Sequence, residues 1–298
     1  MFYLFYGFVW LIAWLPLRIL YVLSDFCYPV VYYVLGYRKK VVRKNLCCSF
    51  PEKTDKEIRA IEKKFYRFFC DTFIETIKKM HISGEEMSRR MTYSNKEQLL
   101  EQLNQGKSVY MMTAHYGNWE WFSSFSLVTS SKYWVTQVYK KQKSKHFNDF
   151  MLELRTKFHT VNIEKKQSLR AMLEINKEGT PTIFGMLSDQ WPGGVKNPHC
   201  VQFLNQHTPV LTGTETLAKK MNLPVFFGKV SRPKRGYWNI EFIPITLNPL
   251  ETAEFEITET YMKMLEEVIV EKPEYWLWSH KRWKNRKTPP PSSSEEIN

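Results

Sequence analysis

The chain has 298 residues, of which 43% are hydrophobic, so it is long enough to bury one sizeable core and to carry an additional segment. Its 43 lysines and arginines outnumber its 30 aspartates and glutamates. The resulting formal charge of +13 favours an anionic partner, such as a membrane surface, an acidic carrier protein or nucleic acid. The five cysteines contain no C-x-x-C pair, which argues against a disulfide framework or a structural zinc site and fits a reducing compartment.

The N-terminal residues predict a membrane anchor. Residues 2–37 are dense in apolar and aromatic side chains, and the charged residues among them are Arg18 and Asp25. A membrane span needs about 20 apolar residues. Residues 2–23 supply such a span if Arg18 reaches the lipid headgroups, and residues 26–37 are then interfacial or re-entrant. No cleavage site is visible, so we expect the segment to stay attached. The alternative is a pair of apolar helices buried inside a soluble fold.

A basic cluster follows directly and indicates how the anchor is oriented. Such clusters favour the cytoplasmic side of a membrane. We therefore divide the chain into a membrane anchor with a basic juxtamembrane segment (residues 1–44), a folded cytoplasmic domain (residues 45–287) and a tail rich in proline and serine (residues 288–298), which we expect to be disordered. The cluster consists of Arg38, Lys39, Lys40, Arg43 and Lys44.

The stretch from residue 51 to residue 83 predicts one long amphipathic helix. Thr54 and Glu57 form a capping box near its start, and apolar residues recur at helical spacing along it. We interpret this apolar stripe as core packing rather than as a cofactor site.

Beyond this helix, the spacing at which apolar residues recur changes repeatedly between that of a helix and that of a strand. A second capping box, Ser94 with Glu97, predicts a helix that ends at the turn 104–106. Short apolar runs then alternate with helical stretches, which predicts an α/β fold with a mixed sheet flanked by helices. The predicted strands are 108–114, 133–138, 182–187, 225–230 and 237–245, and the predicted helices are 118–128, 145–158, 168–177, 214–221 and 257–270.

His115 and Glu120 are the best candidates for chemistry. They lie in the sequence TAHYGNWE, where a predicted strand enters a polar turn, and ligands of open α/β sheets bind at such strand ends. Gly117 can supply the bend that lets Glu120 reach back to the imidazole from the first helical turn. A carboxylate on one ring nitrogen makes the other a better base for deprotonating a hydroxyl. From the spacing alone, a surface histidine beside a helix-start glutamate is an equally good interpretation.

Other chemistries find less support in the sequence. A zinc site needs a third ligand and usually an H-E-x-x-H motif, so no metal is expected. There is no G-x-S-x-G elbow and no cysteine beside His115, which favours direct attack without a covalent enzyme intermediate. Candidate donors to an oxyanion are Arg155 and the backbone N–H groups that follow Gly117, at Asn118 and the helix start.

Three separated motifs carry a resemblance to a known family. HYGNWE around His115, SDQ at residues 188–190 and PEYWLWSHKRWK at residues 273–284 together resemble the lipid A biosynthesis late acyltransferases, within the lysophospholipid acyltransferase superfamily. The resemblance implies transfer of a fatty acyl chain from acyl carrier protein to a hydroxyl of a lipid A precursor. It also implies that residues 45–287 are the catalytic domain, at the cytoplasmic face of the inner membrane, and that no cofactor is used.

The resemblance also implies roles for individual residues. His115 and Glu120 match the family's H-x4-E motif, as base and orienter. Arg155, Asp189 and a second arginine, Arg170, match further family positions that bind substrate or stabilise the oxyanion. The chain departs from the family at Tyr139-Lys140, where the family often has an arginine after the tyrosine. A lysine there keeps the charge but loses the bidentate fork.

Rival interpretations remain at this point. The same base could serve another acceptor, such as a lysophospholipid, an aminolipid or a glycolipid. A basic membrane-binding protein without catalysis also fits the charge. Nucleic acid is not an expected partner, because no RNP motif or zinc finger is present. Basic clusters at residues 140–145, 232–235 and 280–287 are typical of solvated surface, and none is assigned as a site.

Overall fold

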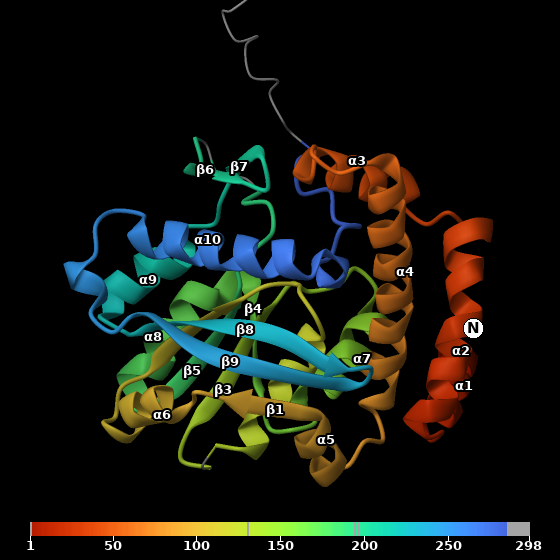
Figure 1. The fold of residues 1–298 in the computed structure, drawn as a ribbon. Coiled ribbons are helices and arrows are strands. Elements are labelled where there is room, and N and C mark those ends of the chain that lie inside the picture. Colours follow the sequence, from red (N-terminus) through yellow and green to blue (C-terminus); the bar gives the residue numbers. More distant parts are fainter. Residues whose placement is uncertain (1, 130, 194, 196, 285–298) are drawn as a thin grey trace, which may run out of the picture.

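A mixed sheet forms the centre of the molecule (Figure 1). The computed structural model describes residues 2–129, 131–193, 195 and 197–284, with side chains from residue 6 onward, so the predicted tail at residues 288–298 lies outside the described residues. The seven-stranded sheet has the order β1-β9-β8-β2-β5-β3-β4, and β6 and β7 form a separate hairpin. The strands are β1 Met91–Ser94, β2 Val109–Thr113, β3 Trp134–Tyr139, β4 Val161–Glu164, β5 Thr182–Leu187, β6 Cys200–Phe203, β7 Gln206–Pro209, β8 Val225–Lys234 and β9 Tyr237–Thr246.

Helices cover both faces of this sheet, which confirms the expected fold class (Figure 1). The α-helices are α1 Phe2–Ala13, α2 Leu17–Pro29, α3 Lys39–Ser49, α4 Asp55–Lys78, α5 Gly84–Arg90, α6 Glu97–Asn104, α7 Lys145–Thr156, α8 Ser168–Glu178, α9 Gly213–Met221 and α10 Glu256–Glu271. The shorter or tighter helices are η1 Val30–Val34 (a π-helix), η2 Trp119–Leu127, η3 Lys165–Gln167, η4 Pro249–Glu251 and η5 Pro273–Tyr275.

The two faces of the sheet can be told apart at β8 and β9. On one face Phe227 packs against Tyr261 of α10, with ring centroids 5.9 Å apart. On the other face Phe242 packs against Phe125 of η2, with centroids 4.8 Å apart. Phe242 is paired with Gly228, the residue after Phe227, and successive residues of a strand face opposite sides. The sheet is therefore sandwiched between α10 and η2.

The register between β2 and β5 decides which residues meet at the edge of the sheet. The two strands are parallel neighbours, and Thr113 at the end of β2 lies opposite Leu187 at the end of β5. Because both strands end at the same edge, residues the same number of positions past each end become neighbours. His115 and Asp189 have this relationship.

Most elements predicted from periodicity are confirmed. The strands predicted after residue 107 are present as β2, β3, β5, β8 and β9, but η2 is a 3-10 helix rather than the α-helix expected at residues 118–128. Sequence analysis did not identify β1, β4, β6 and β7. Each has four residues, which is too short for an alternating pattern to stand out.

The two predicted capping boxes differ in outcome. The box of Thr54 and Glu57 is confirmed at the start of α4, where the Glu57 carboxylate accepts from the Thr54 N–H at 2.8 Å. The box of Ser94 and Glu97 is wrong, because Ser94 is the last residue of β1 and its hydroxyl accepts from Asn239 Nδ2 at 3.0 Å. A side chain committed to a neighbouring strand does not cap the next helix, and α6 begins after Lys96 without a side-chain cap.

The N-terminal segment is a broken pair of helices rather than one span. Pro16 separates α1 from α2, so the continuous span expected over residues 2–23 is wrong. Proline has no N–H and therefore cannot continue the hydrogen-bond ladder of α1. The carbonyls of Ala13 and Leu15 instead accept from Lys78 Nζ of α4, at 3.1 and 3.0 Å. The turn between α1 and α2 is thus fixed to the rest of the fold by a lysine.

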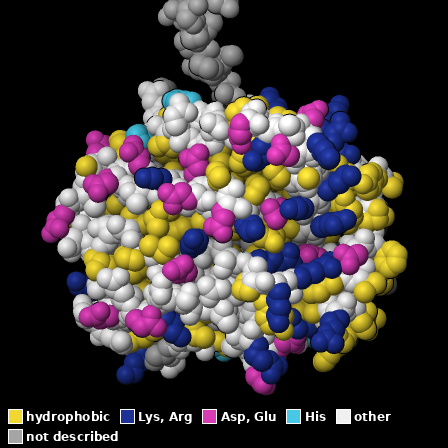
Figure 2. All heavy atoms as spheres, in the orientation of Figure 1, with side chains coloured by type: hydrophobic (Ala, Val, Ile, Leu, Met, Phe, Trp, Pro, Cys, Tyr) yellow, Lys and Arg dark blue, Asp and Glu magenta, His cyan; other side chains and the backbone are white. Residues whose placement is uncertain are grey.

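The outer surface of this helix pair is strongly apolar. Large hydrophobic side chains on it are exposed, with Leu11 at 64%, Phe26 at 70% and Val34 at 76%. Yellow side chains accordingly crowd the right-hand edge of Figure 2, over α1 and α2. Within the described part of the chain, one helical stretch, Leu17–Val34, is long and apolar enough to cross a membrane, with a mean hydropathy of 1.2. An exposed apolar surface of this kind marks a site of contact with lipid or protein.

A buried carboxylate on α4 joins this helix pair to the sheet edge. Glu75 is fully buried and accepts hydrogen bonds from Tyr21 of α2 at 2.6 Å, from Asn118 Nδ2 at 2.6 Å and from Trp238 Nε1 of β9 at 3.0 Å. Burial raises the pKa of Glu75, while the charge of Arg232 and the donated hydrogen bonds act in the opposite direction. One side chain therefore connects the N-terminal helices, the turn after β2 and the β8–β9 hairpin.

We predict that Glu75→Gln destabilises the fold. An amide keeps one acceptor oxygen but turns the other into a donor that faces donors, which costs about 1 to 3 kcal/mol for a buried group. Urea unfolding of the detergent-solubilised protein measures the loss. The matched control is Glu97→Gln, an exposed residue at the start of α6, for which a change within about 0.5 kcal/mol is expected. Equal stability of the two variants would contradict the role given to Glu75.

Candidate active site

His115 lies just past the end of β2, beside Asp189. The His115 Nδ1 is 2.8 Å from Asp189 Oδ1, and 18% of the His115 side chain is exposed. Asp189 is buried, and its other oxygen accepts from the indole N–H of Trp276 at 3.0 Å. Burial would raise the pKa of Asp189, but the charge of the imidazole and these hydrogen bonds lower it below its ordinary value. An ionised carboxylate therefore fixes the orientation of the ring.

The other ring nitrogen of His115 faces Gln190. Gln190 Nε2 is 3.1 Å from His115 Nε2. Gln190 Nε2 is also 3.3 Å from His115 Nδ1, so the amide lies against the ring, close to both nitrogens. Since Asp189 accepts the proton of Nδ1, Nε2 carries the lone pair. The ring of Trp119 packs against the imidazole at a steep angle, with centroids 5.2 Å apart. Nε2 is therefore the basic nitrogen of the pair.

Glu120 makes a different hydrogen bond from the one expected. Its buried carboxylate accepts from Arg155 Nε at 2.9 Å and from Arg155 Nη2 at 2.5 Å. Burial would raise the pKa of Glu120, but the hydrogen bonds and charge of Arg155 lower it. A guanidinium offers two parallel donors and a full charge, which match a carboxylate better than one ring N–H does. In this structure Asp189, not Glu120, accepts the hydrogen bond of His115.

A buried lysine supports the turn that carries Glu120. Lys79, which follows α4, donates from Nζ to the backbone carbonyl of Glu120 at 2.7 Å and to the hydroxyl of Ser123. Burial lowers the pKa of Lys79 to about 7, although the charge of Glu120 opposes the shift. Sequence analysis missed Lys79, because its partners are a backbone carbonyl and a serine far along the chain.

The turn between His115 and η2 requires glycine. Gly117 has φ +63°, and a Cβ at this position would lie 2.6 Å from Val230 Cγ1 and 2.8 Å from the ring of Trp238. Its N–H donates to the carbonyl of Tyr275 at 2.9 Å, so this N–H is already used within the protein. Gly117 therefore shapes the turn, its own N–H is engaged by Tyr275, and the oxyanion role of the N–H groups that follow it stays a prediction.

Asn118 is also used within the protein. It is buried, its Nδ2 donates to Glu75 at 2.6 Å, and its Oδ1 accepts from the N–H of Trp121 at 3.2 Å, which caps η2. Both polar ends of the side chain are thus engaged within the protein, and the expected contact of the Asn118 backbone N–H with an oxyanion stays a prediction.

Arg170 lies apart from these residues. It is on α8, its side chain is 85% exposed, and it pairs with Glu174 one helical turn away at 2.7 Å. The structure therefore brings together His115, Asp189, Glu120 and Arg155, and it places Arg170 on a solvated helix surface.

The closing motif of the chain forms one wall of the site. The segment after α10 pairs with the turn after β2, through an antiparallel bridge between Tyr116 and Trp276 and a hydrogen bond from Leu277 N–H to the His115 carbonyl at 3.1 Å. Trp276 and Trp278 are buried in this wall. Two motifs that are distant in the sequence thus form one structure around the imidazole.

A largely apolar groove opens beside the site. The cavity has a volume of about 420 Å³ and runs between α4, α7 and the closing segment. Trp119 and Glu120 line it, and the Trp119 ring also packs against the imidazole, so Trp119 lies between the groove and His115. Burial lowers the pKa of His280, on the groove wall, to about 4. The groove-lining residues include Phe69, Phe73, Ile77, Phe147, Phe150 and Met151.

Metal-binding geometry does not appear among the residues that the structure describes, since no group of three or more His, Cys, Asp or Glu could hold an ion. The cysteines are all free thiols. The chemistry available at the site is therefore that of an oriented imidazole, a paired arginine and an apolar groove.

Comparisons with known proteins agree with this chemistry. The family model described as bacterial lipid A biosynthesis acyltransferase matches residues 1–285. A lipid A biosynthesis lauroyltransferase of Escherichia coli (strain K12) is 22% identical over 302 residues, which cover 95% of this chain and 94% of that protein. The family match spans nearly the whole chain and includes both the N-terminal helices and the closing wall of the site. This chain belongs to the bacterial lipid A biosynthesis acyltransferase family.

Proposed function

We propose that this acyltransferase moves a fatty acyl chain from acyl carrier protein to a hydroxyl of a lipid A precursor, with His115 as general base. The observation that carries the proposal is the His115–Asp189 pair beside an apolar groove, from which it is separated by the ring of Trp119. A base for an alcohol and a slot for a hydrocarbon chain are the two requirements of this reaction.

The proposed chemistry is a direct transfer. His115 Nε2 removes the proton of the acceptor hydroxyl as the oxygen attacks the thioester carbonyl, and Asp189 stabilises the imidazolium that forms. The tetrahedral intermediate then collapses, the C–S bond breaks, and the imidazolium returns the proton to the departing thiolate. The amide of Gln190 lies against the imidazole in the free protein, where the acceptor hydroxyl would also bind, so the acceptor displaces it.

Arg155 is the proposed donor to the oxyanion. Its guanidinium is mostly buried, and the bidentate pair with Glu120 fixes its plane. Glu120 then acts through Arg155, as a positioning residue, and Lys79 holds the turn on which Glu120 lies. A preorganised cation in a water-poor site stabilises developing negative charge more than the same group would in water.

The groove between α4 and α7 is the proposed site of the acyl chain. Its lining is mainly aromatic and aliphatic. Acyl carrier protein and a phosphorylated saccharolipid are both anionic, and the chain's charge of +13 suits both. The reaction as proposed needs no cofactor.

The exposed apolar surface of α1 and α2 is the proposed membrane contact. It would hold the catalytic domain on the cytoplasmic face of the inner membrane, where the basic residues of α3 meet the headgroups. Because Tyr21 of α2 is hydrogen-bonded to Glu75 of α4, the helix pair lies against the catalytic domain. We infer an interfacial anchor with its apolar side in the lipid.

The function is tested by mass spectrometry of membrane lipids from cells that carry the intact chain or His115→Ala. We expect one acyl group on lipid A to disappear in the variant, and transfer from acyl carrier protein in vitro to fall by about 10² to 10⁴. Asp189→Asn should lower the rate as well, and His207→Ala, on the separate β6–β7 hairpin, is the control. If the missing acyl group belongs to a phospholipid, an aminolipid or a glycolipid, the acceptor assignment is wrong.

We predict that Met151→Trp shortens the preferred acyl chain. Met151 lines the groove from α7, and a larger side chain removes length from a hydrocarbon slot. The measurement is kcat/KM for acyl carrier proteins loaded with chains of graded length. Leu169→Trp, at an exposed position on α8, is the control. An unchanged length preference in the Met151 variant would place the acyl chain elsewhere.

We predict that Phe26→Glu combined with Val34→Glu weakens membrane binding. Both side chains are exposed on the apolar surface, and a charge there must leave water when the surface enters lipid. Flotation with vesicles measures the effect, and Leu250→Glu, an exposed position on η4, is the control. These substitutions test the membrane contact more directly than a deletion of residues 1–37, because the deletion also removes the hydrogen bond from Tyr21 to the buried Glu75. Unchanged flotation would show that the contact lies elsewhere.

A further inference from the structure

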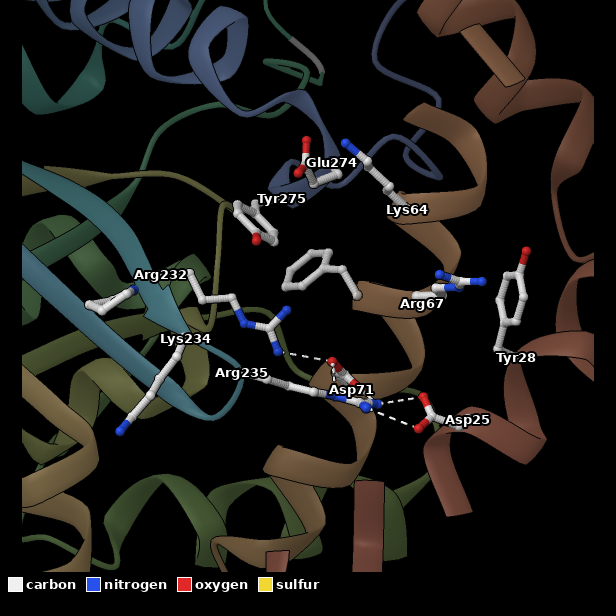
Figure 3. A pocket seen from close by; sticks show the side chains of 12 residues that line it. Asp25, Tyr28, Lys64, Arg67, Asp71, Arg232, Lys234, Arg235, Glu274 and Tyr275 are labelled. Atoms are coloured by element: carbon white, nitrogen blue, oxygen red, sulfur yellow. Dashed lines mark hydrogen bonds and ion pairs between the residues drawn. The ribbon is translucent and has the colours of Figure 1, made fainter. Parts of the chain in front are cut away.

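A second large cavity lies on the other side of α4 from the acyl groove. It has a volume of about 660 Å³ and is enclosed by α2, α4 and the tip of the β8–β9 hairpin (Figure 3). On α4 it is lined by Lys64, Arg67 and Asp71, whereas the acyl groove is lined by Phe73 and Ile77. At 3.6 residues per turn these two sets of side chains point in roughly opposite directions. The cavity is therefore separate from the catalytic groove.

Positive charge predominates in this cavity. Its lining includes the cations Lys64, Arg67, Arg232, Lys234 and Arg235 and the carboxylates Asp25, Asp71 and Glu274. Figure 3 shows Arg232 and Arg235 converging on Asp71 at the base of the cavity. Arg235 also pairs with Asp25 at 2.7 Å. These two arginines and two carboxylates form a fixed, neutral base.

The remaining charged groups of the lining are three cations and one carboxylate, Glu274, so the rest of the lining keeps a net positive charge. Within the described residues, Lys64, Arg67 and Lys234 have no carboxylate at ion-pair distance, and all three are exposed. Arg67 lies over the ring of Tyr28 at 5.1 Å, and Lys234 lies over the ring of Tyr237 at 4.1 Å. These contacts hold the two cations in place, and both side chains stay exposed. The rim of the cavity can therefore bind an anion.

The Nε of Arg232 is a hydrogen-bond donor that the described protein does not use. It is buried and has no hydrogen-bond partner in the described structure. The guanidinium lies between the rings of Trp238 and Tyr275, at 5.0 and 5.6 Å from their centroids. The surrounding protein covers this atom, so a ligand in the cavity would contact the cations of the rim and not the Arg232 Nε.

The cavity also borders the apolar surface of α2. Asp25 and Tyr28 of this helix line it, and Val22 and Phe26, on the same helix, are 54% and 70% exposed. Figure 2 shows a column of lysine and arginine side chains next to the yellow edge of the molecule. An occupant with a negative headgroup and hydrocarbon tails would place the headgroup among the cations and the tails along α2.

We propose that this cavity binds the phosphodiester headgroup of an anionic membrane phospholipid. Phosphate matches the arginine and lysine donors of the rim. Basic groups at the depth of the headgroups attract anionic lipid, at about 1 kcal/mol for each. The site lies outside the catalytic groove, so it holds a structural lipid that fixes how deeply and at which angle α2 and α4 meet the membrane. This inference does not depend on the identity of the acyl acceptor.

The test compares two triple variants of the full chain with the same change in charge. Lys64→Gln, Arg67→Gln and Lys234→Gln remove the exposed rim of the cavity. Lys107→Gln, Lys177→Gln and Lys220→Gln remove exposed lysines at the ends of α6, α8 and α9, on the side of the molecule away from α2 (Figure 1). Flotation at one fixed ionic strength compares vesicles of phosphatidylcholine alone with vesicles that also contain phosphatidylglycerol.

We expect phosphatidylglycerol to strengthen binding of the native protein and of the control variant to a similar degree. The rim variant should lose this gain by about tenfold to a hundredfold, while its binding to phosphatidylcholine alone stays unchanged. An equal loss in both triple variants would show diffuse attraction and would overturn the site. An unchanged gain in the rim variant would overturn it as well. A third result would also overturn the proposal: inorganic phosphate raises the thermal stability of the native protein but not of the rim variant, and phosphatidylglycerol does not strengthen binding. The ligand would then be a free anion.

Discussion

The register of two neighbouring parallel strands determines where the chemistry lies. With Thr113 opposite Leu187, the chains leaving β2 and β5 run side by side, and His115 meets Asp189 at 2.8 Å. The other parts of the site are arranged around this pair. The closing segment pairs with the turn after His115 and donates to Asp189 through Trp276, and η2 carries Trp119 against the other side of the imidazole. A shift of one residue in the register would turn one of the two side chains to the opposite face.

Much of this could be predicted from the sequence, and the failures share a physical cause. The apolar run of β2 and the helical spacing of apolar residues in α4 predict these two elements. His115 is a candidate because it follows a predicted strand and precedes a glycine turn. The partner of the imidazole could not be found in the same way, because strand order is a long-range property, and the nearest carboxylate in the sequence, Glu120, is claimed by Arg155. A usable signal was present: SDQ follows its strand at the same offset as His115 follows β2. The prediction that Ser94 caps a helix was wrong for the opposite reason. The local sequence fits a capping box, but the Ser94 hydroxyl accepts a hydrogen bond from Asn239 of the neighbouring strand.

The structure also explains why the N-terminal helices cannot be treated as a detachable anchor. Glu75 accepts from Tyr21 on one side and from Asn118 in the catalytic turn on the other, and Lys78 closes the end of α1. Tyr21 donates to Glu75 and Ser24 donates to Asp71, so α2 has a polar inner side, whereas its outer side is apolar. A helix of this kind lies along a membrane surface more readily than it crosses the bilayer alone.

The amide of Gln190 beside the imidazole of His115 has a consequence for the enzyme when no acceptor is bound. In the proposed reaction, a thioester in a groove open to solvent is exposed to hydrolysis, and an uncovered imidazole would activate water as readily as an acceptor hydroxyl. An amide that already lies against the imidazole must first be displaced, and a single mobile water gains little from displacing it. A large acceptor, bound through many contacts, brings enough binding energy to do so. Gln190 would then slow hydrolysis of the bound acyl donor until an acceptor alcohol is present.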